Sequence, residues 1–173
     1  MSFNKKQMFI LLLLFLLFIL NGCMLKDKET YKTQIQAYED EEAFYKNSLR
    51  VINKCFVDIG EDDTASSASA VKELSIQMKL IEERYLSSNF DEIVPCKDAT
   101  NFIKFNLDAV RLGKSAVDNI SKYYKQDKSS FDWSASNWYA YVSDISNVYS
   151  NFTYAAKKLE TIRNNLEQEK PIK

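Results

Sequence analysis

The chain has 173 residues, a formal net charge of −1 at pH 7 and no histidine. The sequence shows no strong positive charge and no stripe of Lys and Arg, which argues against nucleic acid as a partner. The lack of histidine removes the commonest general base and the usual metal ligand, so we expect no catalysis, no metal and no cofactor. Only three Gly and two Pro occur, too few for a turn-rich β-sandwich or barrel.

An apolar segment lies close to the N-terminus. Lys5 and Lys6 precede an unbroken apolar run from Met8 to Leu20. This run matches the apolar region of a signal peptide and is shorter than the roughly 20 residues that a spanning helix needs. It is followed by Asn21-Gly22-Cys23.

The tetrad from Leu20 to Cys23 resembles the lipobox of bacterial lipoproteins, although Asn21 stands where a smaller residue is commoner. The resemblance covers residues 1–23 only. It implies that residues 1–22 are a cleaved signal peptide and that Cys23 carries a diacylglycerol and a third acyl chain such as palmitate. Several acyl chains give stable membrane anchoring. The alternatives are an uncleaved N-terminal anchor and a signal peptide cut elsewhere.

The lipoprotein interpretation sets the compartment and the domain limits. We expect the cell envelope. The resemblance also implies the outer membrane in a Gram-negative host, since Met24 rather than an acid follows the cysteine. Removal of 22 of the 173 residues leaves 151, a usual size for one domain. We predict a lipid-anchored tether over 23–30, a helical bundle domain over 31–168 and a frayed tail over 169–173.

Two further cysteines remain once Cys23 is acylated. An even number of cysteines in an oxidising compartment favours pairing, so we predict a disulfide between Cys55 and Cys96. The alternative is two buried free thiols.

Heptad-like spacing of apolar residues predicts four helices, at about 27–59, 65–88, 99–126 and 136–167. The first seam contains Tyr31, Ile35, Tyr38, Glu42, Tyr45, Leu49, Ile52, Phe56 and Ile59. The second contains Val71, Leu74, Met78, Ile81 and Tyr85. The third contains Ile103, Asn106, Val110, Gly113, Val117, Ile120 and Tyr124, beside a stripe of Phe102, Ala109, Ala116 and Tyr123. The fourth contains Trp138, Tyr141, Ile145, Val148, Phe152, Ala155, Leu159, Ile162 and Leu166.

Four such seams predict an all-α protein, a single four-helix bundle with antiparallel neighbours. Residues 89–97, with Pro95, should form a loop or a single turn against the bundle. A monomer is favoured over a homo-oligomer, because the seams can cover one another. The predicted disulfide conflicts with simple antiparallel order, since Cys55 and Cys96 would lie at opposite ends. A crossover, a short or bent second helix, or unpaired thiols would each resolve the conflict.

Aromatic residues crowd into the last helix and the segment before it. Trp133, in the expected loop, and Tyr139, Tyr149 and Tyr154, outside or beside the seam, form a candidate binding surface, because exposed Trp and Tyr make good partner anchors. Alternatively, they cover a loop or the third helix. Glu42 is the one acid in the first seam, and we interpret residues 39–42 as a solvated acidic patch rather than a buried carboxylate site.

These features predict a non-enzymatic, lipid-anchored envelope protein whose bundle binds a protein or another envelope component. One alternative is an immunity or exclusion lipoprotein that blocks a toxin, a phage or a conjugating cell. Others are a structural subunit of an envelope complex and a carrier of a small apolar ligand.

Overall fold

The computed structural model describes the backbone of residues 5–60, 64–125 and 131–171, and the side chains of residues 28–59, 67–125 and 136–171. The described chain forms five helices, and no strand occurs in these ranges. They are α1 (Lys5–Gly60), α2 (Thr64–Leu86), α3 (Phe90–Ile93), α4 (Lys97–Lys125) and α5 (Phe131–Gln168). The all-α prediction is therefore confirmed.

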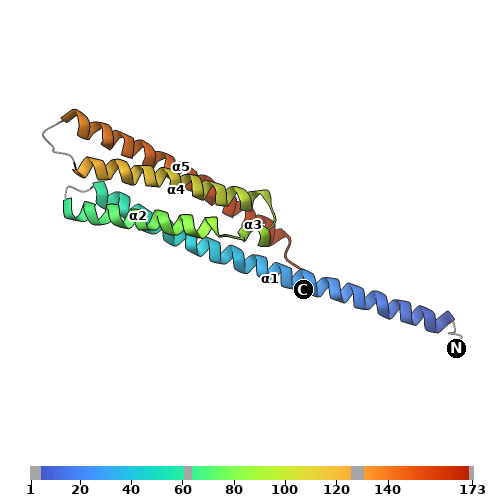
Figure 1. Ribbon diagram of the computed structural model, residues 1–173. Coiled ribbons are helices and arrows are strands. Elements are labelled where there is room, and N and C mark those ends of the chain that lie inside the picture. The colour runs from blue at the N-terminus through green and yellow to red at the C-terminus, as the bar shows by residue number, and fades with distance from the viewer. Residues whose placement is uncertain (1–4, 61–63, 126–130, 172–173) are drawn as a thin grey trace.

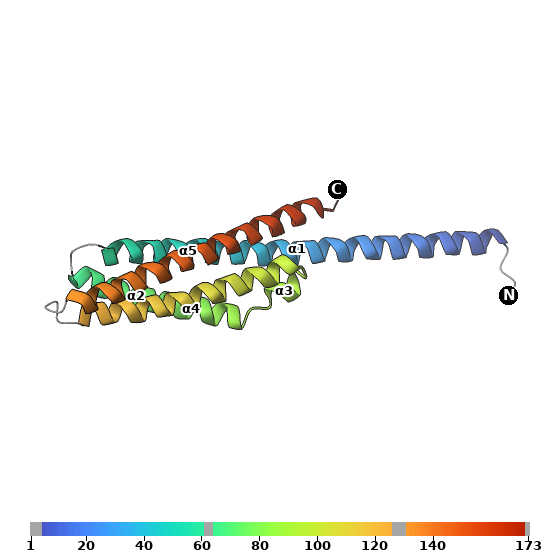
Figure 2. The ribbon, with the colours of Figure 1, turned by 90° about the horizontal axis from the view of Figure 1, so that it is seen from above.

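The four long helices run in alternating directions (Figure 1). α1 packs on α2, α2 on α4, α4 on α5, and α5 on α1, which closes an antiparallel bundle. The view from above shows α5 returning along α1 toward the side from which the N-terminal helix extends (Figure 2). We call that side the proximal end, and the side where α1 and α4 finish the distal end.

α3 is the single turn expected between the second and third long helices. Its Phe90 and the following Val94 are buried, and Ile93 packs against the core. The backbone N–H of Val94 donates to the carbonyl of Phe90 at 2.8 Å. This turn covers the proximal end of the core, where α3 contacts both α1 and α4.

α1 is a single helix from the apolar segment into the bundle. It begins well before Asp27, where the pattern predicted its start, so the segment 23–30 that was predicted as a tether is part of this helix. Tyr38 is the first buried residue among the described side chains. At 1.5 Å per residue, the helix from Cys23 to Tyr38 is about 22 Å long. Within the part of the chain that the structure describes, no helix is long and apolar enough to cross a membrane.

The buried face of α1 differs from the predicted seam at every second position. Tyr38, Tyr45, Ile52 and Ile59 are buried as predicted. The positions between them that are buried are Glu41, Ser48 and Cys55, one residue before the predicted Glu42, Leu49 and Phe56. The reason is that α1 packs between two long helices. Glu41 and Ser48 face α2, where they contact Arg84 and Gln77. On the other side, Phe56 packs against Tyr149 of α5 at 5.3 Å between ring centroids.

Polar contacts of period seven join α1 to α2. Arg84 pairs with Glu41 at 2.7 Å, and Gln77 Nε2 donates to Ser48 Oγ at 3.0 Å. One further heptad along, Cys55 and Ala70 line the same hollow. Because seven-residue steps on each helix keep these pairs together, α1 and α2 share one antiparallel register.

Small residues line the buried face of α4, which packs most extensively on α5. Buried positions occur in both the predicted seam and the stripe beside it, whereas Ile103, Val117, Tyr123 and Tyr124 are only partly buried. The buried residues are Ala99, Phe102, Asn106, Ala109, Val110, Gly113, Ala116 and Ile120. The small members allow close helix approach, and Phe102, Val110 and Ile120 fill the core beside them.

The predicted Cys55–Cys96 disulfide is wrong, because both thiols are free. Cys55 lies beside Ala70, near the start of α2, whereas Cys96 lies beyond the end of α2. The helix from Ala70 to Leu86 alone spans about 24 Å, and a disulfide requires Cα atoms within about 7 Å. The bundle keeps simple antiparallel order, and the conflict is resolved by unpaired thiols.

Candidate functional site

Four aromatic side chains pack together at the distal end of the bundle. Tyr123 and Tyr124 of α4 contact each other at 5.4 Å between ring centroids, Tyr123 contacts Trp138 of α5 at 5.5 Å, and Trp138 contacts Tyr141 at 5.4 Å. The Tyr124 hydroxyl donates to the carbonyl of Ile59 at 2.9 Å. We call Tyr123, Tyr124, Trp138 and Tyr141 the distal aromatic cluster. It ties the ends of α1, α4 and α5 together.

Tyr139 lies beside this cluster and is 72% exposed. The neighbouring Trp138 and Tyr141 face inward, so Tyr139 projects from the opposite side of α5. The Trp133 backbone lies in the first turns of α5 rather than in a loop, and its side chain lies outside the described residues. Exposure of Tyr139 agrees with its predicted position outside the seam.

Tyr149 and Tyr154 lie further along α5 and form a separate surface. Tyr149 packs edge-on against Phe56 of α1, and Tyr154 packs on Phe105 of α4 at 5.4 Å between ring centroids. Burial raises the pKa of Tyr149. Both rings remain partly exposed and border a shallow hollow of about 390 Å³. The hollow is also lined by Ser146, Ser150, Thr153 and Lys157.

The described members of the predicted binding surface therefore do not form one patch. Ten residues of helix, about 15 Å, separate Tyr139 from Tyr149. The alternative interpretation holds for part of the set, since Tyr149 and Tyr154 also cover neighbouring helices. Tyr139, at the distal end, is the member that the bundle leaves most open.

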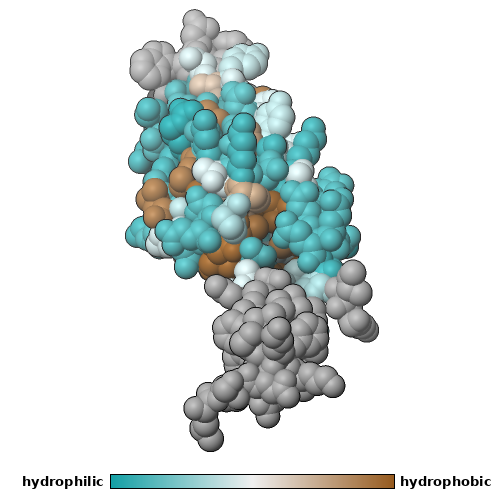
Figure 3. All heavy atoms as spheres, turned by 90° about the vertical axis from the view of Figure 1, so that its right-hand side faces the viewer, coloured by the Kyte–Doolittle hydropathy of each residue, from teal (hydrophilic) through white to brown (hydrophobic). Residues whose placement is uncertain are grey.

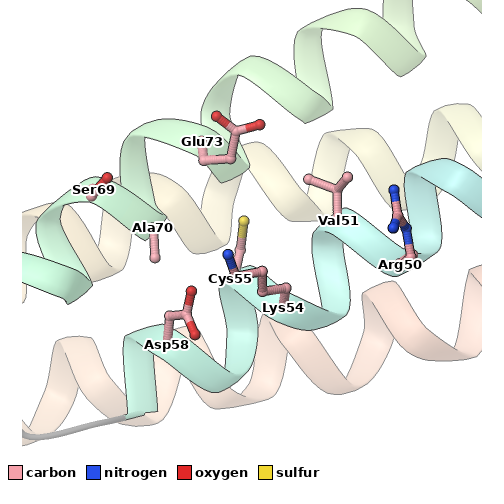
Figure 4. Close-up of a pocket in the computed structure, with 8 residues that line it drawn as sticks. All are labelled: Arg50, Val51, Lys54, Cys55, Asp58, Ser69, Ala70 and Glu73. Carbon is pink, nitrogen blue, oxygen red and sulfur yellow. The ribbon is translucent and has the colours of Figure 1, made fainter.

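A larger hollow of about 700 Å³ lies between α1 and α2 (Figure 4). Its lining combines charges of both signs with a few small or apolar side chains. The residues are Arg50, Val51, Lys54, Cys55, Asp58, Ser69, Ala70 and Glu73. Burial, followed by the charges of Glu73 and Asp58, raises the pKa of the Cys55 thiol. A charged lining does not favour a small apolar ligand.

Glu42 lies on the side of α1 that faces α5, and it is only partly buried. It accepts hydrogen bonds from Tyr38 at 3.0 Å and pairs with Lys46 at 3.1 Å. Burial raises the pKa of Glu42, but the hydrogen bonds from Lys46 and Tyr38 outweigh it and leave the pKa lowered. Burial, with the hydrogen bond to Glu42, raises the pKa of Tyr38 to about 12. Glu42 is thus a paired surface carboxylate.

The buried acid of this helix is Glu41, which the sequence analysis placed in the solvated patch. It is 4% exposed and receives Arg84 from α2. Its other oxygen, Oε2, has no hydrogen-bond partner, and neither has the buried hydroxyl of Tyr85. One signal in the sequence could have identified Glu41 as buried. Glu41, Ser48 and Cys55 are seven residues apart, so they share one face of the helix, but a seam on that face would contain polar residues.

The described surface offers no cluster of metal ligands. Figure 3 faces the end from which α1 extends, where hydrophilic side chains cover most of the described surface and apolar side chains show in small areas between them. The side chain of Cys23, the predicted acylation site, lies outside the described residues. No family model, curated protein or solved structure matches the chain.

Proposed function

We propose that this protein is a non-enzymatic lipoprotein of the bacterial envelope, anchored through Cys23, whose distal end binds a protein or another envelope component. The observation that carries the proposal is the continuity of α1, which runs from the lipobox-like segment through Cys23 into the bundle. An acyl anchor on Cys23 would therefore be joined to the bundle by a helix, with about 22 Å between Cys23 and the first buried residue.

The direction of this helix supports the distal end as the binding region. From Tyr38, α1 continues along the bundle to Gly60 at the distal end (Figure 1). The distal aromatic cluster would therefore lie farther from the anchor than the rest of the core. Tyr139 is the exposed aromatic residue beside that cluster. A large, stiff side chain with a polar tip buries much area on binding at little entropic cost.

Two experiments test the two halves of the proposal in cells that make the protein. Metabolic labelling with a fatty acid should mark the wild-type chain and not Cys23→Ala, and labelling of Cys23→Ala would refute the anchor. For the binding region, a photo-crosslinking amino acid replaces Tyr139, with exposed Thr161 of the same helix as the control position. Position 139 should capture one defined partner more strongly than position 161.

Equal capture at the two positions, or none at Tyr139, would refute the distal end as the binding region. The identity of the captured protein separates the versions of the function. A toxin, phage or conjugation component indicates an exclusion lipoprotein, and a resident envelope protein indicates a subunit of an assembly.

A further inference from the structure

The hollow in Figure 4 opens between α1 and α2, and the helix period extends its lining along both helices. Residues seven apart on a helix lie on one face. Phe44, seven residues before Val51, therefore continues the floor of the hollow along α1. On α2, Ile76 and Leu80 follow Ser69 and Glu73 by seven residues and continue the rim. We call this surface the α1–α2 groove.

Apolar side chains in this groove remain exposed. Ile76 is 45% exposed and Leu80 is 47% exposed, while Phe44 and Val51 are partly buried. Phe44 and Val51 pack on one side against the core, Phe44 against the Tyr85 ring at 6.0 Å between centroids, whereas Ile76 and Leu80 lie outside the core cluster. Apolar side chains that flank a groove between helices are suited to contact with other helices.

The two rims of the groove carry opposite net charges. Arg50 and Lys54 outnumber Asp58 on the α1 rim, and Glu73 stands on the α2 rim. Lys54 and Glu73 form no ion pair among the described residues, and the Arg50 hydrogen bond goes to Asn47 of its own helix at 3.0 Å. A partner that meets this face should therefore present acid opposite α1 and base opposite α2.

We propose that the occupant of the α1–α2 groove is the same groove of a second copy of this chain, related by a two-fold axis parallel to the helices. Such a rotation leaves heights along the bundle unchanged and sets α1 of one copy against α2 of the other. Arg50 and Lys54 then face Glu73 of the second copy, and Asn47 faces Ile76. The contact is self-complementary, as a two-fold interface must be.

The opposite arrangement, with the axis across the helices, fits less well. It would set α1 against α1 and bring Arg50 and Lys54 near their own copies at the level of the hollow. The parallel arrangement also keeps both N-termini at one end, as two anchors in one membrane require. The requirement that two anchors lie in one membrane rests on the proposed function, whereas the charge argument does not.

Like charges limit the length of the contact. Asp40 is seven residues before Asn47, and Glu83 is seven residues after Ile76, so these acids approach each other at the proximal end of the groove. The interface therefore spans residues 47–58 of α1 and 69–80 of α2. This dimer departs from the expected monomer, because the groove residues lie outside the seams on which that expectation was based.

Charge reversal tests the proposal with the full chain in detergent micelles, by sedimentation velocity at several protein concentrations. The wild type should dimerise, and salt should weaken the dimer. Arg50→Glu/Lys54→Glu and Glu73→Lys should each weaken dimerisation at least about tenfold. A mixture of the two variants should form a heterodimer, because both contacts between them are again of opposite charge. Lys72→Glu, beside Glu73 and outside the hollow lining, should dimerise like the wild type.

The mixing experiment distinguishes contact between copies from a contact within one copy, which a second chain cannot restore. Helix content measured by circular dichroism identifies a variant that has not folded. If a variant fails to fold, sedimentation of the wild type at several protein and salt concentrations still shows whether the dimer forms. A wild type that stays monomeric, or reversed variants that dimerise normally, would overturn the dimer. Cys23→Ala should retain the dimer, so loss of lipid labelling and loss of dimerisation are separate results.

Discussion

Arg84 of α2 donates two hydrogen bonds to one oxygen of Glu41 in α1, from Nη2 at 2.7 Å and from Nε at 3.1 Å. The two partners differ in environment. The Glu41 side chain is 6% exposed, whereas the Arg84 side chain is 40% exposed and lies over the Phe44 ring at 5.2 Å from its centroid. The carboxylate therefore depends on its partner more than the guanidinium does.

We predict that Arg84→Ala destabilises the protein more than Glu41→Ala. Removal of Arg84 leaves a buried carboxylate without a counter-charge, which costs about 3–5 kcal/mol. Removal of Glu41 leaves a guanidinium that water and Phe44 still contact, which costs about 1–3 kcal/mol. Urea unfolding followed by circular dichroism measures both. The double variant should lose less than the two single losses combined.

The neighbouring acid provides the control for this pair. Glu42 is partly exposed and pairs with Lys46 on its own helix, so Glu42→Ala should cost less than about 1 kcal/mol. A loss at Glu42 equal to that at Glu41 would contradict the assignment of Glu41 as the buried member.

A second prediction concerns Gly113, where α4 approaches α2. A Cβ added there would overlap Met78 Sδ and lie 2.9 Å from Met78 Cε. Met78 is fully buried, so its side chain must find another place within the core. We expect Gly113→Ala to destabilise the protein by about 1–3 kcal/mol, despite the better helix propensity of alanine.

The control for Gly113 separates packing from helix propensity. Asp118→Ala on the exposed face of α4 should leave the free energy of unfolding nearly unchanged or raise it slightly. Met78→Ala in the Gly113→Ala background should cost less than Met78→Ala alone, because the new methyl group fills part of the space. Additive losses would show that the two residues do not compete for one volume.

The sequence predicted the bundle and most of α5 because large apolar residues recur there without competition. In α5 the residues from Tyr141 to Leu166 that were assigned to the seam are buried, apart from a partly buried Ile145. In α1 the bulky Leu49 and Phe56 outweighed Ser48 and Cys55 in the pattern. Two long helices contact α1, however, and its smaller polar side packs against α2.

The candidate surface could be predicted only in part, because exposure depends on which helices are neighbours. Tyr139 lies opposite the α5 seam, and its exposure followed from periodicity. Tyr149 and Tyr154 lie at the edges of the buried face, where Phe56 and Phe105 cover one side of each ring. The α1–α2 groove depends on how α1 and α2 are aligned by the pairs Glu41–Arg84 and Ser48–Gln77. The pattern of a single helix does not contain that alignment.

A third prediction concerns alkaline pH. Burial raises the pKa of Tyr45 to about 12, and burial with the Glu42 hydrogen bond raises that of Tyr38 to about 12. In the unfolded chain tyrosine ionises near pH 10. The folded state thus holds more protons between these values, so its stability is full below about pH 10 and falls as pH rises toward about 12.

Tyrosine variants followed by circular dichroism across this pH range measure the effect. Tyr45→Phe loses the hydrogen bond from the Tyr45 hydroxyl to the Phe152 carbonyl, 2.5 Å in the structure, which costs about 1 kcal/mol at neutral pH. The same variant should lose stability less steeply above pH 10 than the wild type. Exposed Tyr139→Phe should keep the wild-type slope, and an unchanged slope in Tyr45→Phe would contradict the prediction.

The fourth prediction follows from the two free thiols. In the folded full chain, Cys55 is 3% exposed between α1 and α2, and its pKa is raised by burial, Glu73 and Asp58. Cys96 is only partly buried. Thiolate is the reactive form, and Cys55 can react only after α1 and α2 separate locally.

Alkylation without reductant, followed by peptide mass analysis, should modify Cys96 at least about tenfold faster than Cys55. In denaturant both should react at once, and resistance of both until a reductant is added would establish the disulfide that the structure excludes. Cys55→Ser removes the slow phase and identifies it as the opening of the α1–α2 contact.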